Sequence, residues 1–248
     1  VDPSGNWEFT PTTPLVDGPH DFSTEVLDPA GNSSGQGSPT HITIDTSGVI
    51  VSITHVIDDV GSITGDIALH GVTDDARPDI VGTGKAGAIV TIKDGDTVLG
   101  STTIDAKGNW SFTPSSDLAE GLHNITATAV DLTGNTGSSS VFDFTVDTTA
   151  PAKPTIDQVY DDVGDIQGPI PNGGVTDDSN PTLSGKAEPG STVTVYDNGQ
   201  PLGSVTADPS GNWSYTPTTP ISEGPHTFTA DATDKAGNTC LLYTSPSP

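Results

Sequence analysis

The chain has 248 residues, with 33 Asp and Glu against 7 Lys and Arg, and a formal net charge of -26. This balance argues against nucleic acid as a partner, because phosphate recognition needs clustered Lys and Arg, and against docking on anionic lipid. There is no Met, no signal peptide and no apolar run long enough to span a membrane. We therefore expect an internal segment of a longer chain, with no membrane insertion within it.

A repeat of 103 residues organises the sequence. Trp7, Trp110 and Trp213 each follow Gly-Asn and stand 103 residues apart. A period near one hundred residues indicates tandem domains, since the units of a solenoid run about 20–50 residues. We expect residues 1–48 to be the C-terminal half of a unit, 49–150 a complete unit, and 151–239 a unit lacking its last strand. Residues 240–248, "CLLYTSPSP", replace that strand, resemble translated sequencing-adapter sequence and are interpreted as a non-native tail.

Short β-type runs separated by turn residues follow one another along the complete unit. Alternation of apolar and polar residues is clear in the later runs "TVTVYD" and "HTFTADATD", and no window has helical periodicity. The runs expected to form strands are 51–58, 79–86, 88–95, 97–105, 109–114, 123–131 and 140–147. Seven strands, all antiparallel, in about 100 residues predict an all-β fold of tandem immunoglobulin-like β-sandwich domains.

Paired carboxylates mark the loop after the first strand. "IDDVGSITGDIALHGVTDDARP" holds Asp58, Asp59, Asp74 and Asp75, with only Arg77 to offset them. The second copy repeats the pairs as Asp161, Asp162, Asp177 and Asp178. Like charges this close repel, and calcium (Ca²⁺) favours oxygen ligands, so a bound calcium ion would neutralise them. The competing interpretation is a solvated acidic surface.

The motif Asp-x-x-Gly-Asn occurs six times, starting at Asp2, Asp28, Asp105, Asp131, Asp208 and Asp234. As a structural element it predicts a tight turn, in which Asp accepts backbone N–H bonds and Gly takes a positive φ. The same oxygens are also candidate calcium ligands, which would have to be assembled from several loops because no EF-hand pattern is present.

Strand order predicts where these oxygens meet. If the first strand leaves the N-terminal end of a sandwich, the loop after it lies at the opposite end. The turns before the fifth and seventh strands then lie at the N-terminal end, facing the preceding unit. The carboxylates expected at the hinge after residue 150 are Asp58, Asp59, Asp74, Asp75, Asp147, Asp208 and Asp234. Calcium between them is the expected cofactor.

The remaining conspicuous side chains favour structural duties. The three tryptophans precede Phe or Tyr by two residues, which places two aromatics on one strand face and predicts core positions. His20, His123 and His226 occur once per unit, so we expect structural histidines rather than zinc ligands. Carboxylate pairs can serve glycoside cleavage, but their recurrence in each unit indicates a structural role. We expect no enzyme.

The motifs together resemble the bacterial Ig-like repeats of giant type I-secreted, biofilm-associated surface adhesins. The resemblance rests on "DTTAP" (147–151), the "DDVG…TDD..P" loop, "GKAEPG" (185–190) and "GNWSYTP" (211–217). It implies extracellular stalks at the bacterial cell surface, with calcium near the domain junctions. The first junction departs from this pattern, since it reads "DTSGVIVS" where the second reads "DTTAPAKP".

The function expected from this resemblance is a calcium-rigidified spacer in cell adhesion and biofilm formation. Its partners would be neighbouring repeats of the same chain, with the host surface or biofilm matrix contacted by other parts of the protein. One alternative is a glycan- or matrix-binding module, which should expose aromatic side chains outside the core. Another is an accessory domain of a secreted hydrolase, which requires a catalytic domain elsewhere in the chain.

Overall fold

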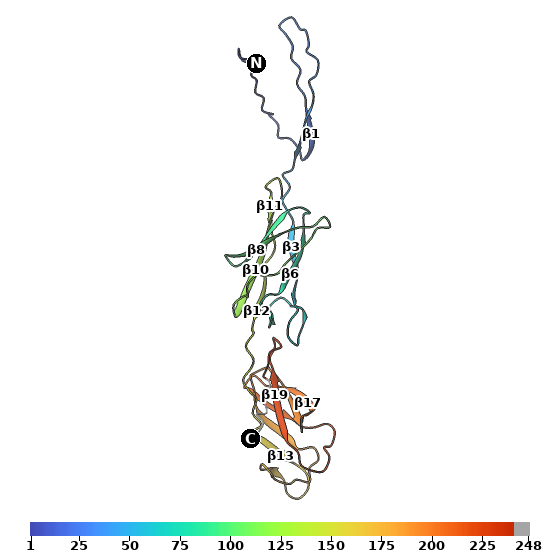
Figure 1. Cartoon of the computed structure of the whole chain (residues 1–248), viewed down its shortest axis with the longest axis vertical. Coiled ribbons are helices and arrows are strands. Elements are labelled where there is room, and N and C mark those ends of the chain that lie inside the picture. Colours follow the sequence, from blue (N-terminus) through green and yellow to red (C-terminus); the bar gives the residue numbers. More distant parts are fainter. Residues whose placement is uncertain (241–248) are drawn as a thin grey trace.

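The computed structural model describes residues 1–240. Every regular element in them is a β-strand, and the three units follow one another end to end (Figure 1). Within these residues there is no helix with the length and apolar character that crossing a bilayer requires.

The middle unit is a sandwich of two sheets. One sheet has the order β4-β3-β6-β9, with β4 (Gly65–Asp66), β3 (Val51–Asp58), β6 (Asp79–Gly84) and β9 (Asn109–Phe112). The other has the order β5-β12-β10-β7-β8, with β5 (Gly71–Thr73), β12 (Phe142–Val146), β10 (Gly121–Val130), β7 (Ile89–Asp94) and β8 (Thr97–Thr103), and β11 (Thr136–Ser138) pairs with β10. All seven strands expected between residues 51 and 147 are present, which confirms the predicted fold class.

One strand pair differs from the prediction that all pairing is antiparallel. β5 runs parallel to β12, with Phe144 opposite Gly71 and Val146 opposite Thr73. The chain reverses once in the hairpin between β3 and β4, and again in a tight turn where Gly71 N donates to Ala68 O over 2.8 Å. Two reversals return β5 to the direction of β3, which is also the direction of β12. The cause is a crossing between sheets, which the alternation of residues does not encode.

The core of the middle unit lies between its two sheets. Trp110 is 3% exposed and belongs to a cluster with Ile80, Ile92 and Phe144, which are fully buried. Trp110 fits because β6 carries Gly82 beside it: a Cβ there would lie 2.3 Å from the indole and 2.0 Å from the carbonyl oxygen of Ser52. The predicted core position of this tryptophan is confirmed, and so is that of Trp213, which is also 3% exposed.

The third unit repeats the two-sheet arrangement. Its first sheet is β14-β13-β15-β18, with β14 (Gly168–Pro169), β13 (Gln158–Asp161), β15 (Thr182–Lys186) and β18 (Asn212–Tyr215). Its second is β17-β16-β19-β20, with β17 (Gln200–Thr206), β16 (Thr192–Asp197), β19 (Phe228–Thr233) and β20 (Thr239–Cys240). Up to residue 240 this unit has no counterpart of β12. Cys240, the first residue of the expected tail 240–248, lies in β20 and pairs with Ala232 of β19. Residues 241–248 lie outside the described part.

The first unit is a single two-stranded sheet, β1 (Gly18–Phe22) paired with β2 (Thr40–Ile44). Trp7 is 60% exposed and Phe9 is 72% exposed. The predicted core position of Trp7 is therefore wrong. Residues 1–48 contain no second sheet against which the indole could pack, whereas Trp110 and Trp213 lie under a facing sheet.

Candidate metal centre

The Asp-x-x-Gly-Asn motif forms the predicted tight turn. In the turn between β8 and β9, Asp105 Oδ1 accepts hydrogen bonds from the backbone N–H groups of Lys107 and Asn109, each over 2.8 Å. Gly108 has a φ of 85°. The bond from Asn109 is the main reason that the pKa of Asp105 lies below its ordinary value. The turn thus stabilises the ionised carboxylate of Asp105.

The acidic loop after β3 holds two buried carboxylates. Asp58 is 6% exposed, and its Oδ2 accepts a hydrogen bond from Thr73 Oγ1 over 2.5 Å. Asp75 is 4% exposed and accepts from the backbone N–H of Arg77 over 2.7 Å. Burial raises the pKa of Asp75 above its ordinary value, with smaller contributions from the charges of Asp58 and Asp59. The loop therefore packs negative charge into the sandwich with neutral donors alone.

Asp74 is the least satisfied carboxylate of this loop. Its Oδ1 is buried and has no hydrogen-bond partner. The backbone of the loop presses against it, since a Cβ at Gly61 would lie 1.9 Å from Asp74 Oδ2. Burial raises the pKa of Asp74, and the charges of Asp58 and of Asp234 in the next unit raise it further. A cation at this place would remove both penalties.

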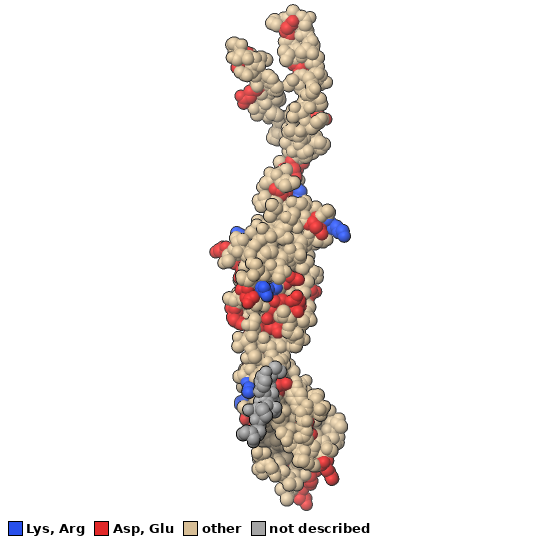
Figure 2. All heavy atoms as spheres, viewed as in Figure 1, with Lys and Arg blue, Asp and Glu red and all other residues tan. Residues whose placement is uncertain are grey.

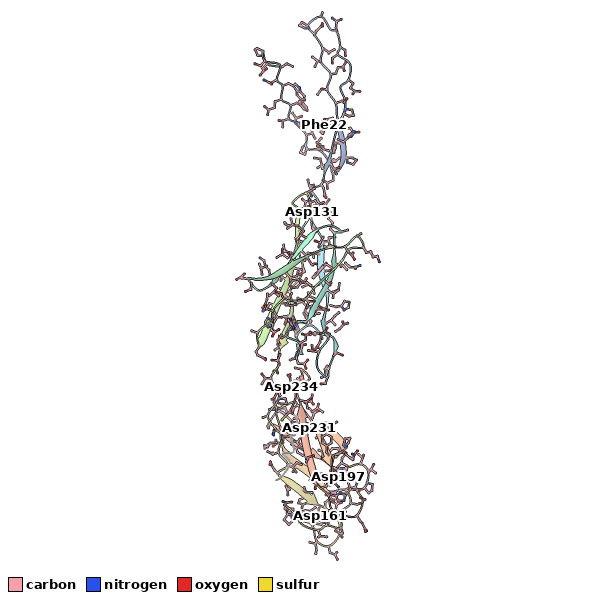
Figure 3. All side chains as sticks on the ribbon, viewed as in Figure 1. Phe22, Asp131, Asp161, Asp197, Asp231 and Asp234 are labelled. Atoms are coloured by element: carbon pink, nitrogen blue, oxygen red, sulfur yellow. The ribbon has the colours of Figure 1, made fainter. Side chains whose placement is uncertain are left out.

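The second junction brings the loops of two units together. The hydroxyl of Ser62 donates to the carbonyl of Gly237 over 2.8 Å, and Asn238 Nδ2 donates to the carbonyl of Asp147 over 2.7 Å. The backbone N–H of Asp147 in turn donates to Thr73 O over 2.9 Å. Figure 3 shows Asp234 at this joint, between the middle and third units. The turn that begins at Asp234 thus lies against the acidic loop of the preceding unit.

The structure places the candidate ligands in three groups. Asp58, Asp59, Asp74, Asp75, Asp147 and Asp234 lie at the second junction. Asp105 and Asp131 lie at the opposite end of the middle unit, and Asp161, Asp162, Asp177 and Asp178 lie in the loop after β13, at the far end of the third unit (Figure 3). Asp208, expected at the hinge, begins the turn between β17 and β18, and its two oxygens accept hydrogen bonds from Ser210 and Asn212 of that turn. The two oxygens of Asp234 accept hydrogen bonds from its own turn in the same way.

Acidic residues gather on the half of the middle unit that lies nearer the third unit (Figure 2). Their carboxylates do not surround a common point. Among the residues that the structure describes, no three or more His, Cys, Asp or Glu side chains converge closely enough to hold a metal ion as they stand. The junction thus presents oxygen ligands from two units that an ion could pull together.

The acidic loop of the third unit repeats this chemistry. Asp161 is 5% exposed and accepts hydrogen bonds from Thr176 Oγ1 and the backbone N–H of Val163. Asp178 is 6% exposed, and its Oδ2 is buried without a partner. Buried carboxylates in this loop are therefore a property of the repeat, although the unpartnered oxygen of the third unit lies on the counterpart of Asp75 rather than of Asp74.

Sequence reasoning missed the contact at the first junction. Lys85 Nζ lies 2.6 Å from Asp45 Oδ2 of the first unit and 2.6 Å from Asp131 Oδ2 of the middle unit. Asn135 Nδ2 donates to the carbonyl of Asp45 over 3.0 Å. Asp131 holds the pKa of Lys85 above its ordinary value, and Lys85 lowers the pKa of both carboxylates. Only the departure of "DTSGVIVS" from the second linker signalled that this junction differs.

The histidines have the same structural environment in successive units. His123 Nδ1 lies 2.7 Å from Asp94 Oδ2 and its Nε2 lies 2.7 Å from the carbonyl of Ala119. His226 makes the same two contacts with Asp197 and with the carbonyl of Ser222, each at 2.7 Å. His123 thus connects β7 to the loop before β10, and His226 connects β16 to the loop before β19.

The fold defines tandem immunoglobulin-like β-sandwiches joined end to end. The family model described as "Bacterial Ig-like domain" matches residues 1–46, 50–148 and 152–241. The chain therefore belongs to the bacterial Ig-like domain family. No curated protein matches the sequence significantly.

Three solved structures resemble the chain. Fibronectin(III)-like modules of Clostridium thermocellum CbhA share 20% identity at a TM-score of 0.42, covering 77% of this chain and 90% of theirs. A tetra-tandem repeat in the extending region of a large adhesion protein shares 23% identity at a TM-score of 0.34, covering 91% and 55%. The BSP domain of a biofilm-associated protein shares 24% at a TM-score of 0.25, covering 76% and 28%.

Proposed function

We propose that this segment is a calcium-rigidified spacer in the extracellular stalk of a repetitive bacterial surface adhesin, acting in cell adhesion and biofilm formation. The observation that carries the proposal is Asp74. Its buried Oδ1 has no donor, and the charges of Asp58 and of Asp234 from the next unit act against its own charge. Membership of the bacterial Ig-like family and the end-to-end arrangement of units support the spacer role.

The residues at the second junction fit the chemistry of calcium. Calcium takes 6–8 oxygen ligands in flexible geometry, from carboxylates, backbone carbonyls and water. The acidic loop offers Asp58, Asp59, Asp74 and Asp75, and Asp234 offers a carboxylate from the other side of the joint. The ion would supply the positive charge that these oxygens lack. Because its ligands come from two units, binding stiffens the joint.

A passive role for the sandwich faces is supported by the burial of their tryptophans. Trp110 and Trp213, in the two units that form sandwiches, are each 3% exposed, so neither ring offers a stacking platform for a sugar. Trp7 is 60% exposed because residues 1–48 lack the facing sheet that covers its counterparts. We therefore place the contact with the host surface or biofilm matrix in other parts of the protein. The partners of this segment are its neighbouring repeats, and its duty is mechanical and non-catalytic.

The test is to compare the full chain in calcium and in chelator by small-angle scattering and thermal unfolding. We expect calcium to lengthen and narrow the distribution of end-to-end distances and to raise the melting temperature of the middle unit. The double variant Asp58→Asn with Asp74→Asn should lose most of both effects. Asp96→Asn, an exposed carboxylate between β7 and β8, is the matched control and should respond as the parent does. Identical profiles and melting temperatures with and without calcium would contradict the proposal.

A further inference from the structure

The first junction contains its own cation. Lys85, at the end of β6, reaches 2.6 Å to Asp45 in the linker that leaves the first unit, and 2.6 Å to Asp131 in the loop between β10 and β11. The Asp131 side chain is 5% exposed, and that of Asp45 is 26% exposed. One ammonium group, itself 37% exposed, thus joins a nearly buried carboxylate of the middle unit to a partly exposed carboxylate of the first unit.

The backbone identifies the residue that occupies this position at the second junction. Lys85 O accepts from the N–H of Ala88 over 3.1 Å, and Glu188 O accepts from the N–H of Ser191 over 3.0 Å. The residues before Lys85 and Glu188 also make equivalent bonds. The backbone N–H of Gly84 donates to Gly108 O, and that of Ala187 donates to Gly211 O, each over 2.9 Å. Glu188 is therefore the counterpart of Lys85, and its side chain is exposed.

The other partners are preserved at both junctions. Asn135 donates to the carbonyl of Asp45, and Asn238 donates to the carbonyl of Asp147. Asp131 and Asp234 begin equivalent Asp-x-x-Gly-Asn turns. The two joints therefore share a frame of one linker carbonyl and one Asn amide. They differ at the position of Lys85, which carries a positive charge at the first junction, whereas its counterpart Glu188 carries a negative charge.

We propose that the ammonium group of Lys85 clamps the first junction and makes it independent of calcium, whereas the second junction, with Glu188 in that position, depends on an added cation. The contrast between the junctions rests on the proposed calcium role of the second. The Lys85 clamp itself rests on the contacts at the first junction alone. The stalk then contains two kinds of joint, one permanently stiff and one that stiffens with calcium.

An isolated surface ion pair contributes little, because solvent screens it and ordering the side chains costs entropy. Lys85 differs from that case in three ways. Its ammonium group is shared between two carboxylates, one of them is almost fully buried, and the Asn135 amide fixes the backbone of the other. The contact with Asp45 connects the two units, so its loss changes the angle between them, whereas the contact with Asp131 lies within the middle unit and contributes to the stability of that sandwich.

The experiment measures distances across each junction in the full chain by electron spin resonance. Spin labels on Thr43→Cys and Ser111→Cys report on the first junction, and labels on Ser111→Cys and Ser214→Cys report on the second, all at exposed strand positions in a Cys240→Ser background. We expect the unmodified first junction to give one narrow distance peak in both calcium and chelator. The second junction should give that peak only in calcium.

Three variants test the clamp. Lys85→Gln should lose the narrow peak of the first junction in chelator, and Asp45→Asn should do the same from the other side of the bridge. Lys107→Gln, an exposed lysine on a neighbouring turn, is the matched control and should keep the peak. Glu188→Lys should give the second junction a narrow peak in chelator.

The outcomes separate the two proposals. If Lys85→Gln and Asp45→Asn both keep the parent's narrow peak in chelator, the clamp is wrong, whatever the second junction does. If the unmodified first junction broadens on chelation as the second does, its independence of calcium is wrong. A second junction that ignores calcium while Lys85→Gln still broadens the first would overturn the calcium role and leave the clamp standing.

Discussion

Replacing Asp74 by Asn separates the two effects that its buried carboxylate has on the second junction. In chelator, Asp74→Asn removes a charge that burial, Asp58 and Asp234 all disfavour. A like charge on a neighbouring side chain costs about 0.5 kcal/mol, which corresponds to about 2–4 °C in the melting temperature of a domain of roughly 100 residues. The variant should therefore melt above the parent without calcium.

Calcium should reverse that order. A site with a dissociation constant of about 0.1 mM, in about 10 mM calcium, adds roughly 2.7 kcal/mol, or about 10–20 °C for a unit of this size. The variant loses the unpartnered oxygen that favours the ion, so most of this rise should disappear. Calorimetry of the parent, Asp74→Asn and the control Asp96→Asn measures the melting temperature of each in chelator and its rise on adding calcium. A variant that melts below the parent in chelator would refute the reasoning, because the charge would then be stabilising.

The same residue predicts a dependence on pH. Because the pKa of Asp74 is raised above 3.8 in the folded state, its charge penalty is absent below pH 3.8, where the carboxyl is protonated in both folded and unfolded chains. The penalty develops as the pH rises through the folded pKa. In chelator, the advantage of Asp74→Asn should therefore vanish in acid and be complete at neutral pH, as urea titrations at several pH values can show.

Three further perturbations test the fold. Trp110→Ala should cost about 3–5 kcal/mol of unfolding free energy, measured by urea titration, and a parent-like midpoint would contradict the buried position. Gly82→Ala should cost about 1–3 kcal/mol or more, because its Cβ would lie 2.0 Å from a carbonyl oxygen, whereas Gly48→Ala, with open space around it, should be nearly neutral. Asp197 raises the pKa of His226, so this pair stabilises the unit below pH 6.5 and less as the pH passes the raised pKa. His226→Gln should flatten that dependence in a pH series of urea unfolding curves.

The strands were predictable because their signals are local. Alternation and turn residues marked all seven strands of the middle unit, and the Gly-Asn-Trp step marked the repeat. The parallel pairing of β5 with β12 was not predictable, because it depends on where the acidic loop crosses between sheets. The exposure of Trp7 was missed for a related reason. Its strand pattern is that of a core residue, and only the presence of a facing sheet decides whether it is buried.

The candidate site was predictable in outline. Alternating strand directions put the acidic loop and the turn at Asp234 at the same joint, and the structure places them together. Strand order locates these turns but not the hydrogen bonds that occupy their carboxylates, which Asp208 and Asp234 both accept from their own turns, so the ligand role of each stays a prediction. Lys85 escaped notice because its partners lie 40 and 46 residues away in sequence, in two different units. Whether calcium occupies the second joint stays a prediction.

The parallel pair of β5 and β12 determines how the middle unit carries a pulling force. The chain enters this unit through β3 and leaves it through β12, at opposite ends (Figure 1). A pull on both ends drags β3 and β5 one way and β12 the other. The hydrogen bonds that pair Gly71–Thr73 with β12, together with the bond from Asp147 N to Thr73 O, are then loaded in shear and all at the same time. A hairpin pulled from its open end unzips one bond at a time, so this geometry makes the unit strong along the axis of a tether.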